Sequence, residues 1–376
     1  VMSNEIKNNE DMNKPMINNE DSIQSEAKAS KGLIAFPDFN YYNIRTFVGK
    51  YADVTGGAGN GRPVVQYHPN GSDNQKFLIF TLDNGYSVIA VKHSGKVLDL
   101  AYNSSGDRLI QYDFNNGDIQ KFAIENNGSI RVKINNQVWD VYRGETWDNA
   151  PIVGYHYQGS QNQKFSLVKN GVVSITRPQM GTLPPAPDFK TNDLNEVLPE
   201  KTDPVNTKVT FIPYFMIKDP SYNHQQQMQL SPYYQLVRRQ YWEKKTQRIL
   251  GPSDKYEYSQ TVGVSRTDQT SMTKTTEISI GLDLGFMFKG FSAGLSTSIT
   301  ETLSVTKSTS NTESTATTQI VTYSNPFTYS IARANYMLID EYYITRANGE
   351  KIVVDNATYW RVPNPERTVA RIIPRN

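Results

Sequence analysis

The sequence predicts an all-β protein made of a repeat domain followed by a second β domain. Three observations favour this fold class: an internal repeat between residues 32 and 170, a proline-rich stretch over residues 171–204, and a long alternation of apolar and polar residues within 205–376. A chain of 376 residues is long enough for two domains that each bury a core of their own. We therefore expect two folding units joined by a connector.

The composition argues against several classes of protein. Without cysteine there are no disulfide bonds, thiolate metal sites or cysteine nucleophiles. The near balance of 39 basic and 37 acidic residues gives no strong positive field, which argues against a nucleic-acid-binding protein. Four scattered histidines argue against a metal centre, and no motif indicates a cofactor, so we expect neither. A mean hydropathy of −0.57, without an apolar run of about 18 residues, argues against a transmembrane helix.

Residues 1–31 are predicted to form a disordered tail. Asn, Glu, Asp, Lys and Ser dominate, so too little apolar surface is available to offset the entropy lost on ordering. The segment lacks the apolar stretch of a secretory signal peptide, and we expect none. Two interpretations stay open: an inert terminus, or a pro-segment removed by cleavage at Lys28 or Lys31.

Residues 32–170 contain three copies of one sequence pattern. Each copy ends in Gln-Lys-Phe, with steps of 45 and 43 residues between the glutamines, and carries a tyrosine ten residues before the phenylalanine. An aspartate lies in a short apolar segment upstream of each copy. The copies are Val64–Phe77, Leu109–Phe122 and Ile152–Phe165. Short strands with Asn/Gly turns, repeated three times, predict a closed β structure of pseudo-threefold symmetry.

This pattern resembles the ricin-B-type β-trefoil lectins, with phenylalanine in place of the tryptophan of their Gln-x-Trp signature. In that family a repeat can hold a sugar, because aspartate and asparagine exchange hydrogen bonds with neighbouring hydroxyls while an aromatic ring covers the apolar face of the sugar. The resemblance implies a receptor- or carbohydrate-binding domain. Its carbohydrate-binding residues would be Asp53, Tyr67, Asn74 and Gln75 in the first repeat, and Asp140, Tyr155, Asn162 and Gln163 in the third.

The second repeat departs from the lectin pattern. It keeps Asp99, Tyr112 and Gln120, but Ile119 occupies the position of the asparagine, so we expect no sugar site there. A purely structural interpretation also stays open for all three repeats, in which the signature glutamine and phenylalanine only support the core and the turns.

Residues 171–204 are predicted to connect the two domains. Six of the nineteen prolines of the chain lie between Pro178 and Pro204. Proline fixes φ and removes a backbone donor, so this stretch is expected to be neither regular helix nor sheet. A connector of this composition is semi-rigid.

The second domain, residues 205–376, contains a long two-faced segment. From 277 to 288 every even position is apolar, and after a turn at Lys289-Gly290 the apolar residues take odd positions, which predicts a β-hairpin over about 277–305. Its apolar face consists of Ile278, Ile280, Leu282, Leu284, Phe286, Phe288, Phe291, Leu295, Ile299 and Leu303.

Two interpretations of this hairpin compete. It is either an ordinary hairpin with one face on a core, or a membrane-spanning hairpin of a β-barrel pore. Both arms exceed the roughly 9–11 residues that a tilted strand needs to cross a bilayer. Sixteen of the 28 residues from Phe291 to Thr318 are Ser or Thr, which can face water without burying charge, and this favours the pore.

Four motifs of the second domain resemble the binary-toxin-like insecticidal proteins of spore-forming bacilli, the BinA/BinB group. They are PYFMIKD at 213–219, SPYYQL at 231–236, QYW at 240–242 and YMLIDEYYITRANG at 336–349. The resemblance implies an elongated, aerolysin-like β-sheet pore-forming domain behind a trefoil receptor-binding head.

The resemblance further implies an insecticidal pore-forming toxin that performs no enzymatic reaction. Its head would bind a cell-surface glycan or glycoprotein receptor, and the chain would then form a homo-oligomer and insert the hairpin into the lipid of the target-cell membrane, with a second toxin component as an optional partner. Such proteins reside in a parasporal crystal or spore-associated inclusion and act at the insect midgut.

Two other functions stay open at this stage. One is a non-toxic lectin or adhesin with a structural β domain. The other is a glycosidase, which would need paired carboxylates in a cleft, for which the sequence has no recognisable signature.

Overall fold

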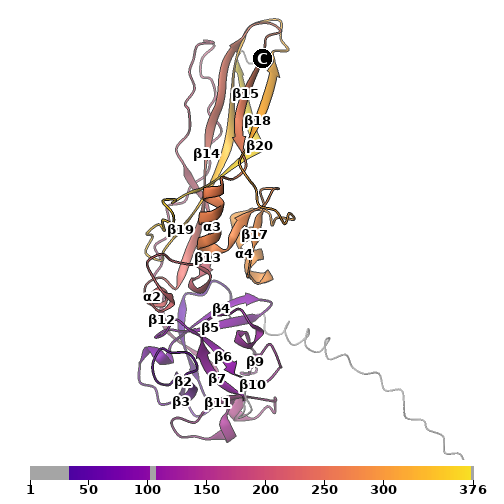
Figure 1. The fold of residues 1–376 in the computed structure, drawn as a ribbon. Coiled ribbons are helices and arrows are strands. Elements are labelled where there is room, and N and C mark those ends of the chain that lie inside the picture. The colour runs from indigo at the N-terminus through magenta and orange to yellow at the C-terminus, as the bar shows by residue number, and fades with distance from the viewer. Residues whose placement is uncertain (1–33, 102–106, 374–376) are drawn as a thin grey trace, which may run out of the picture.

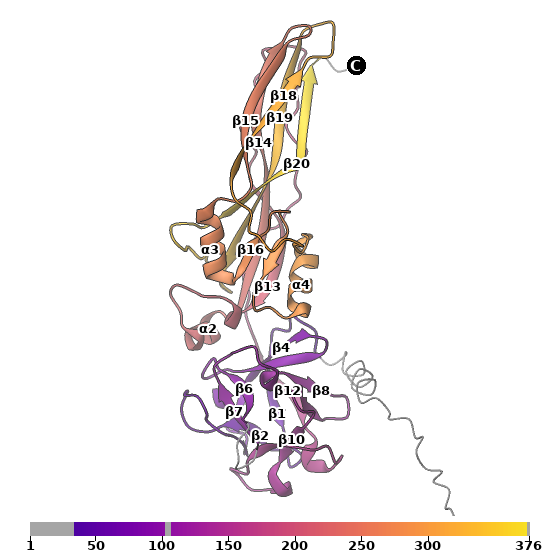
Figure 2. The same cartoon turned by 45° about the vertical axis from the view of Figure 1, so that its right-hand side comes forward.

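The computed structural model describes residues 34–101 and 107–373. The tail expected over residues 1–31, with its cleavage sites at Lys28 and Lys31, lies outside the described residues. The rest forms an elongated molecule, in which a rounded N-terminal head lies at one end of a long, narrow C-terminal body (Figures 1 and 2). The prediction of an all-β protein with a trefoil followed by an elongated β domain is confirmed.

The head is a twelve-stranded antiparallel sheet closed on itself by the pairing of its first and last strands. Each sequence repeat contributes four strands, and the shared pseudo-threefold plan places the same elements in each copy. The strands are β1 (Asn40–Arg45), β2 (Tyr51–Val54), β3 (Val64–Tyr67), β4 (Phe77–Asp83), β5 (Tyr86–Val91), β6 (Val97–Ala101), β7 (Arg108–Tyr112), β8 (Phe122–Ile124), β9 (Ile130–Val132), β10 (Val138–Val141), β11 (Ile152–Tyr155) and β12 (Ser166–Val172).

The Gln-Lys-Phe signature holds the core of the head together. Each signature glutamine ends a short 3-10 helix: η1 (Asp73–Gln75), η2 (Asp118–Gln120) and η4 (Gln161–Gln163). The three signature phenylalanines are buried around the pseudo-threefold axis, and the buried Trp139 meets Phe122 and Phe165 edge-on at 5.4 and 5.8 Å. The signature phenylalanines and Trp139 therefore form part of one buried aromatic core.

The body is built on a four-stranded antiparallel sheet in the order β13 (Val205–Pro213), β14 (Tyr233–Leu250), β19 (Ile331–Thr345) and β20 (Trp360–Ile373). At about 3.3 Å per residue, the 18 residues of β14 span roughly 60 Å. Beside it, β15 (Lys255–Val262) pairs with β18 (Thr317–Ser324) as a separate two-stranded ribbon. The long strands give the body the narrow shape seen in Figure 1.

The proline-rich connector forms a strap, residues 177–204, along the C-terminal half of β14. It contains no helix or regular strand between residues 177 and 200, as its prolines predict. Leu198 is buried, Trp242 Nε1 donates to the carbonyl of Pro184, and Lys244 N donates to Glu200 O at 2.7 Å. The connector is therefore packed against the body along its length.

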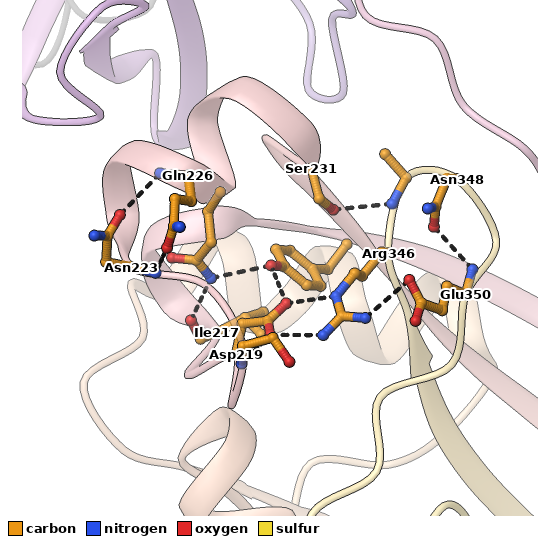
Figure 3. A network of polar contacts seen from close by, with 12 residues as sticks. Ile217, Asp219, Asn223, Gln226, Ser231, Arg346, Asn348 and Glu350 are labelled. Carbon is orange, nitrogen blue, oxygen red and sulfur yellow. Dashed lines mark hydrogen bonds and ion pairs between the residues drawn. The ribbon is translucent and has the colours of Figure 1, made fainter.

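An ion pair fixes the turn region where the body meets the head (Figure 3). Arg346 donates two hydrogen bonds to the carboxylate of Asp219, both at 2.8 Å, and the Tyr234 hydroxyl donates to the same group at 2.6 Å. Burial opposes ionisation of Asp219, but these bonds outweigh it and hold its pKa below the ordinary value. Asp219 of the PYFMIKD motif is therefore a structural residue.

Between β15 and β18 the chain makes a compact insertion of short elements. They are α3 (Arg266–Thr276), β16 (Ile278–Ile280), β17 (Phe286–Phe288) and α4 (Ala293–Leu303). The remaining short helices are η3 (Tyr142–Gly144) in the head, and η5 (Tyr214–Met216) and α2 (His224–Leu230) at its junction with the body. Among the described residues, no helix is both long and apolar enough to span a bilayer.

The prediction of one long β-hairpin over 277–305 is wrong for this state of the protein. The first arm forms only a three-pair ladder between β16 and β17, and the second arm is the helix α4. Leu295, Ile299 and Leu303 are spaced by four residues, so they lie on one helical face and are buried at 2% exposure or less. Two polar residues, Thr297 and Glu301, interrupt the odd-numbered apolar row at the positions where the helix faces solvent.

The apolar row of the first arm is only partly covered. Ile278, Ile280 and Phe286 are buried in the body core, whereas the side chain of Leu282 is 60% exposed. Leu284 has a φ of 60°, which ends the alternation of faces in a tight turn. The first arm therefore leaves its apolar row open to solvent at Leu282.

The insertion docks directly on the head. Ser292 Oγ, the cap of α4, donates to the carbonyl of Leu82 at 2.8 Å, and Asn116 Nδ2 donates to Gly290 O at 3.0 Å. At Gly294 a Cβ atom would lie 2.2 Å from the carbonyl of Leu82. Only glycine allows α4 to approach the β4–β5 hairpin of the head this closely.

A second contact joins the head to α2 and η5. The Tyr214 hydroxyl donates to the carbonyl of Gly95 at 2.6 Å, and Gln225 Nε2 donates to His93 O at 3.1 Å. At Gly95 a Cβ atom would lie 2.2 Å from His224 O, so this turn of the head also requires glycine. Both contacts flank an apolar core that head and body share, in which Phe80 of the head packs against Tyr233 and Phe215 of the body.

Candidate carbohydrate-binding site

The third repeat assembles its predicted site residues around one carboxylate. Asp140 lies at the end of β10, where Asn162 Nδ2 and Gln163 Nε2 each donate to one of its oxygens at 2.9 Å. The same two amides also donate to the carbonyls of Val141 and His156. Burial raises the pKa of Asp140, while the amide hydrogen bonds oppose this rise. Two hydrogen bonds from η4 therefore hold the carboxylate in one orientation, and the two bonds to backbone carbonyls fix the amides that donate them.

This carboxylate opens onto a pocket of about 730 Å³. Asp140, Asn162 and Tyr155 line it together with Tyr142. The Tyr155 side chain is 44% exposed, and its ring rests on His156 at 4.1 Å between centroids, which supports it as a platform. A hydrogen-bonding carboxylate, an amide and exposed aromatic rings around one hollow can bind a sugar through both its hydroxyls and its apolar face.

The first repeat reproduces the same local geometry. Asn74 Nδ2 and Gln75 Nε2 donate to the two oxygens of Asp53, each at 2.8 Å, and the Tyr67 ring lies 4.3 Å from that of His68. The predicted residues of this repeat are therefore brought together as well.

A second carboxylate, Asp148, lies close to the first-repeat site. Asp148 accepts hydrogen bonds from Lys50 and from His68 Nδ1, the latter at 2.7 Å, and these partners lower its pKa to about 2. Asp148 raises the pKa of Asp53, although burial is the larger cause of that rise.

The second repeat lacks one support of its carboxylate. Gln120 Nε2 donates to Asp99 at 2.9 Å, but Ile119 has no amide to offer the other oxygen. The substitution noted in the sequence therefore changes the site geometry in the expected way.

Two predicted sugar contacts have a different place in the structure. Gln75 and Gln163 are 1% and 0% exposed, so they hold the aspartates from within the core and present no surface to a ligand. They are positioning residues. Conversely, the third-repeat pocket is also lined by Tyr142, Arg108 and Arg143, which were not predicted as site residues. Tyr142 could have been predicted as a site residue, because it is aromatic and follows Asp140 by two residues.

Among the residues that the structure describes, no three His, Asp or Glu side chains are grouped so that they could hold a metal ion.

Two family models match the chain, one in the body and one in the head. Residues 206–369 match the family model described as Insecticidal Crystal Toxin, P42, and residues 37–112 match the Ricin-type beta-trefoil lectin domain-like model. Cry35Ab1, described as an insecticidal crystal protein of Bacillus thuringiensis, is 24% identical over 321 residues, which cover 81% of this chain and 82% of that protein. The crystal structure of Cry35Ab1 superposes with a TM-score of 0.71 at 21% identity, over 89% of this chain and 90% of that one.

The binary larvicide subunits of Lysinibacillus sphaericus are also similar. BinB is 25% identical over 297 residues, covering 73% of this chain but only 66% of BinB, so the chain spans just under two thirds of that relative. BinA is 22% identical over 307 residues, covering 80% of this chain and 81% of BinA. The resemblance drawn from the four C-terminal motifs and the trefoil repeats is confirmed.

Proposed function

Because this chain is a homologue of the larvicides BinA and BinB and of Cry35Ab1, and joins a P42 toxin region to a ricin-type trefoil, we propose that it is an insecticidal pore-forming toxin. Its head binds a cell-surface glycan or glycoprotein at the third-repeat pocket and at the first repeat. The body then assembles into a homo-oligomer and forms a β-barrel pore in the target membrane. The toxin catalyses no reaction.

Receptor binding rests on the geometry around Asp140 and Asp53. Each carboxylate is fixed by two amides and lies beside a tyrosine ring. Two sites on one head gain affinity by acting together when the receptor presents several sugars. This arrangement is the single observation that carries the receptor-binding part of the proposal.

Pore formation requires the insertion between β15 and β18 to unfold and extend that ribbon. Leu295, Ile299 and Leu303 of α4 lie with Ile278, Ile280 and Phe286 in the core, and each contributes about 1.5–3 kcal/mol that premature exposure would forfeit. The α4 sequence favours this change of structure, because Thr and Ile are strand formers held in a helix by the surrounding packing. In the extended form its odd-numbered residues would face lipid.

Oligomerisation follows from the physics of the membrane. A single hairpin in lipid would leave the backbone N–H and C=O groups of both edges unpaired, whereas neighbouring subunits in a closed barrel pair all of them. The homologues named as binary subunits support a second toxin component as a further partner. The family description supports storage in a parasporal crystal or spore-associated inclusion and action at the insect midgut cell.

The test is dye release from insect midgut brush-border vesicles and from receptor-free liposomes. The wild-type chain should release dye from the former, and the double variant Leu282→Asp/Leu284→Asp should bind the vesicles but release little dye. Leu282 is exposed in the folded protein, so the single variant Leu282→Asp should retain the melting temperature and controls for the partly buried Leu284, which packs against the core. Binding without any release by the wild type would favour the alternative function, a non-toxic lectin or adhesin.

A further inference from the structure

The third-repeat pocket contains two arginines that the sugar-binding pattern does not require. Arg108 of β7 and Arg143 of η3 both line it beside Asp140. Both side chains are exposed, and the Arg143 guanidinium lies over the Tyr142 ring at 4.9 Å. Within the part of the chain that the structure describes, neither guanidinium lies in an ion pair with a carboxylate. Two arginines at one pocket are thus available to an incoming ligand.

The pseudo-threefold symmetry shows that Arg108 is a departure from the repeat plan. In each repeat one residue at the start of the third strand lies against the neighbouring repeat. Pro63 bridges to Ile110, Pro151 bridges to Val65, and Arg108 pairs with Val153 at the third-repeat pocket. The repeat plan places proline at the two other junctions, so the third-repeat pocket alone receives a cation from its neighbour at this junction.

Arg143 occupies a position where the first repeat has glycine. It follows the last residue of β10 by two, as Gly56 follows the last residue of β2 by two, and the two residues have φ values of 55° and 74°. An arginine pays an energetic cost in this left-handed conformation that glycine does not. Strained residues persist where the surrounding structure or a function requires them.

Guanidinium groups bind carboxylates and sulfates through charge-assisted, often bidentate hydrogen bonds. We propose that the third-repeat pocket binds an acidic saccharide, whose carboxylate or sulfate contacts Arg108 and Arg143 while a sugar hydroxyl contacts Asp140. Asp107 also lines the pocket and forms no ion pair with any residue that the structure describes, whereas both oxygens of Asp140 accept amide hydrogen bonds. This inference rests on the proposed carbohydrate-binding function and specifies its ligand class.

The test is binding of the full chain to an array of matched neutral, carboxylate-bearing and sulfated saccharides. Arg143→Gly copies the first repeat and removes the strain, so it should keep or raise the melting temperature. It should lower the affinity for acidic saccharides about tenfold and leave neutral ones unchanged. Arg108→Gln should likewise lower the affinity for acidic saccharides only. The control Arg45→Gln, at an exposed arginine of β1 outside the pocket, should leave both affinities unchanged.

The possible outcomes distinguish the acidic-ligand inference from the carbohydrate-binding function on which it rests. A preference of the wild type for carboxylated or for sulfated members, lost in Arg143→Gly, identifies which acid the pocket takes. Equal binding of neutral and acidic saccharides, which Asp140→Asn abolishes and Arg143→Gly does not affect, would overturn the acidic-ligand inference and leave the lectin function standing. No saccharide binding at all would overturn both.

Discussion

A lysine placed at Thr297 tests which residues of α4 enter the membrane. Thr297 is exposed on the folded helix, so Thr297→Lys should leave the melting temperature unchanged. In the extended hairpin it lies seven residues from Gly290. At about 3.3 Å per residue and a tilt near 45°, it reaches a depth of about 16 Å, close to the middle of the apolar band.

A lysine on the lipid face at this depth costs about 2–4 kcal/mol in each subunit. Because about 1.4 kcal/mol is a factor of ten, dye release from brush-border vesicles should fall about 30-fold or more. The matched control is Ser298→Lys, at nearly the same depth on the water-filled face. Ser298 is partly exposed and borders a hollow of about 310 Å³ against the head, so a lysine fits there in the folded protein. Equal release by both variants would refute the assignment of faces.

Three further predictions concern the folded protein. Gly294→Ala should push α4 off the head and raise the rate of dye release, because its Cβ would lie 2.2 Å from a backbone carbonyl; a slower rate would contradict this role of the contact. Burial lowers the pKa of His93, so the unfolded chain takes up its proton first as the pH falls below about 6.5. The free energy of unfolding should therefore drop between pH 7 and 5, and His93→Gln should reduce that drop in urea titrations. Asp219→Ala should cost about 3–5 kcal/mol in the same titrations, since it removes the buried carboxylate that pairs with Arg346 and leaves only the exposed Glu350, and a loss below 1 kcal/mol would contradict this.

The trefoil could be predicted because its information is local and repeated. The Gln-Lys-Phe signature sets both the 3-10 turn and the buried aromatic, and the Asp–Asn pairing follows from one repeat alone. The helix α4 was missed because Leu295, Ile299 and Leu303 satisfy both a period of two and a spacing of four. Only the core that surrounds this segment decides between the two structures in the folded protein.

The two pocket arginines could not be predicted from a single repeat. Arg108 reaches the site from the neighbouring repeat, so its role depends on the register between β7 and β11. Arg143 looks like an ordinary loop residue until its φ of 55° is known. Residues that belong to a site through register or backbone conformation are those that sequence patterns describe least well.

The strap along β14 has a consequence for handling the purified protein. β13 pairs with β14 only as far as Gln240, and beyond that point the strap supplies the hydrogen-bonding partners of Trp242 and Lys244. An uncovered edge of this length would be a template for another chain to add a strand. The prolines of the strap lack amide hydrogens, so it shields the edge without offering a new one. Proteolytic nicking of the strap should therefore produce precipitation before it produces any loss of head structure.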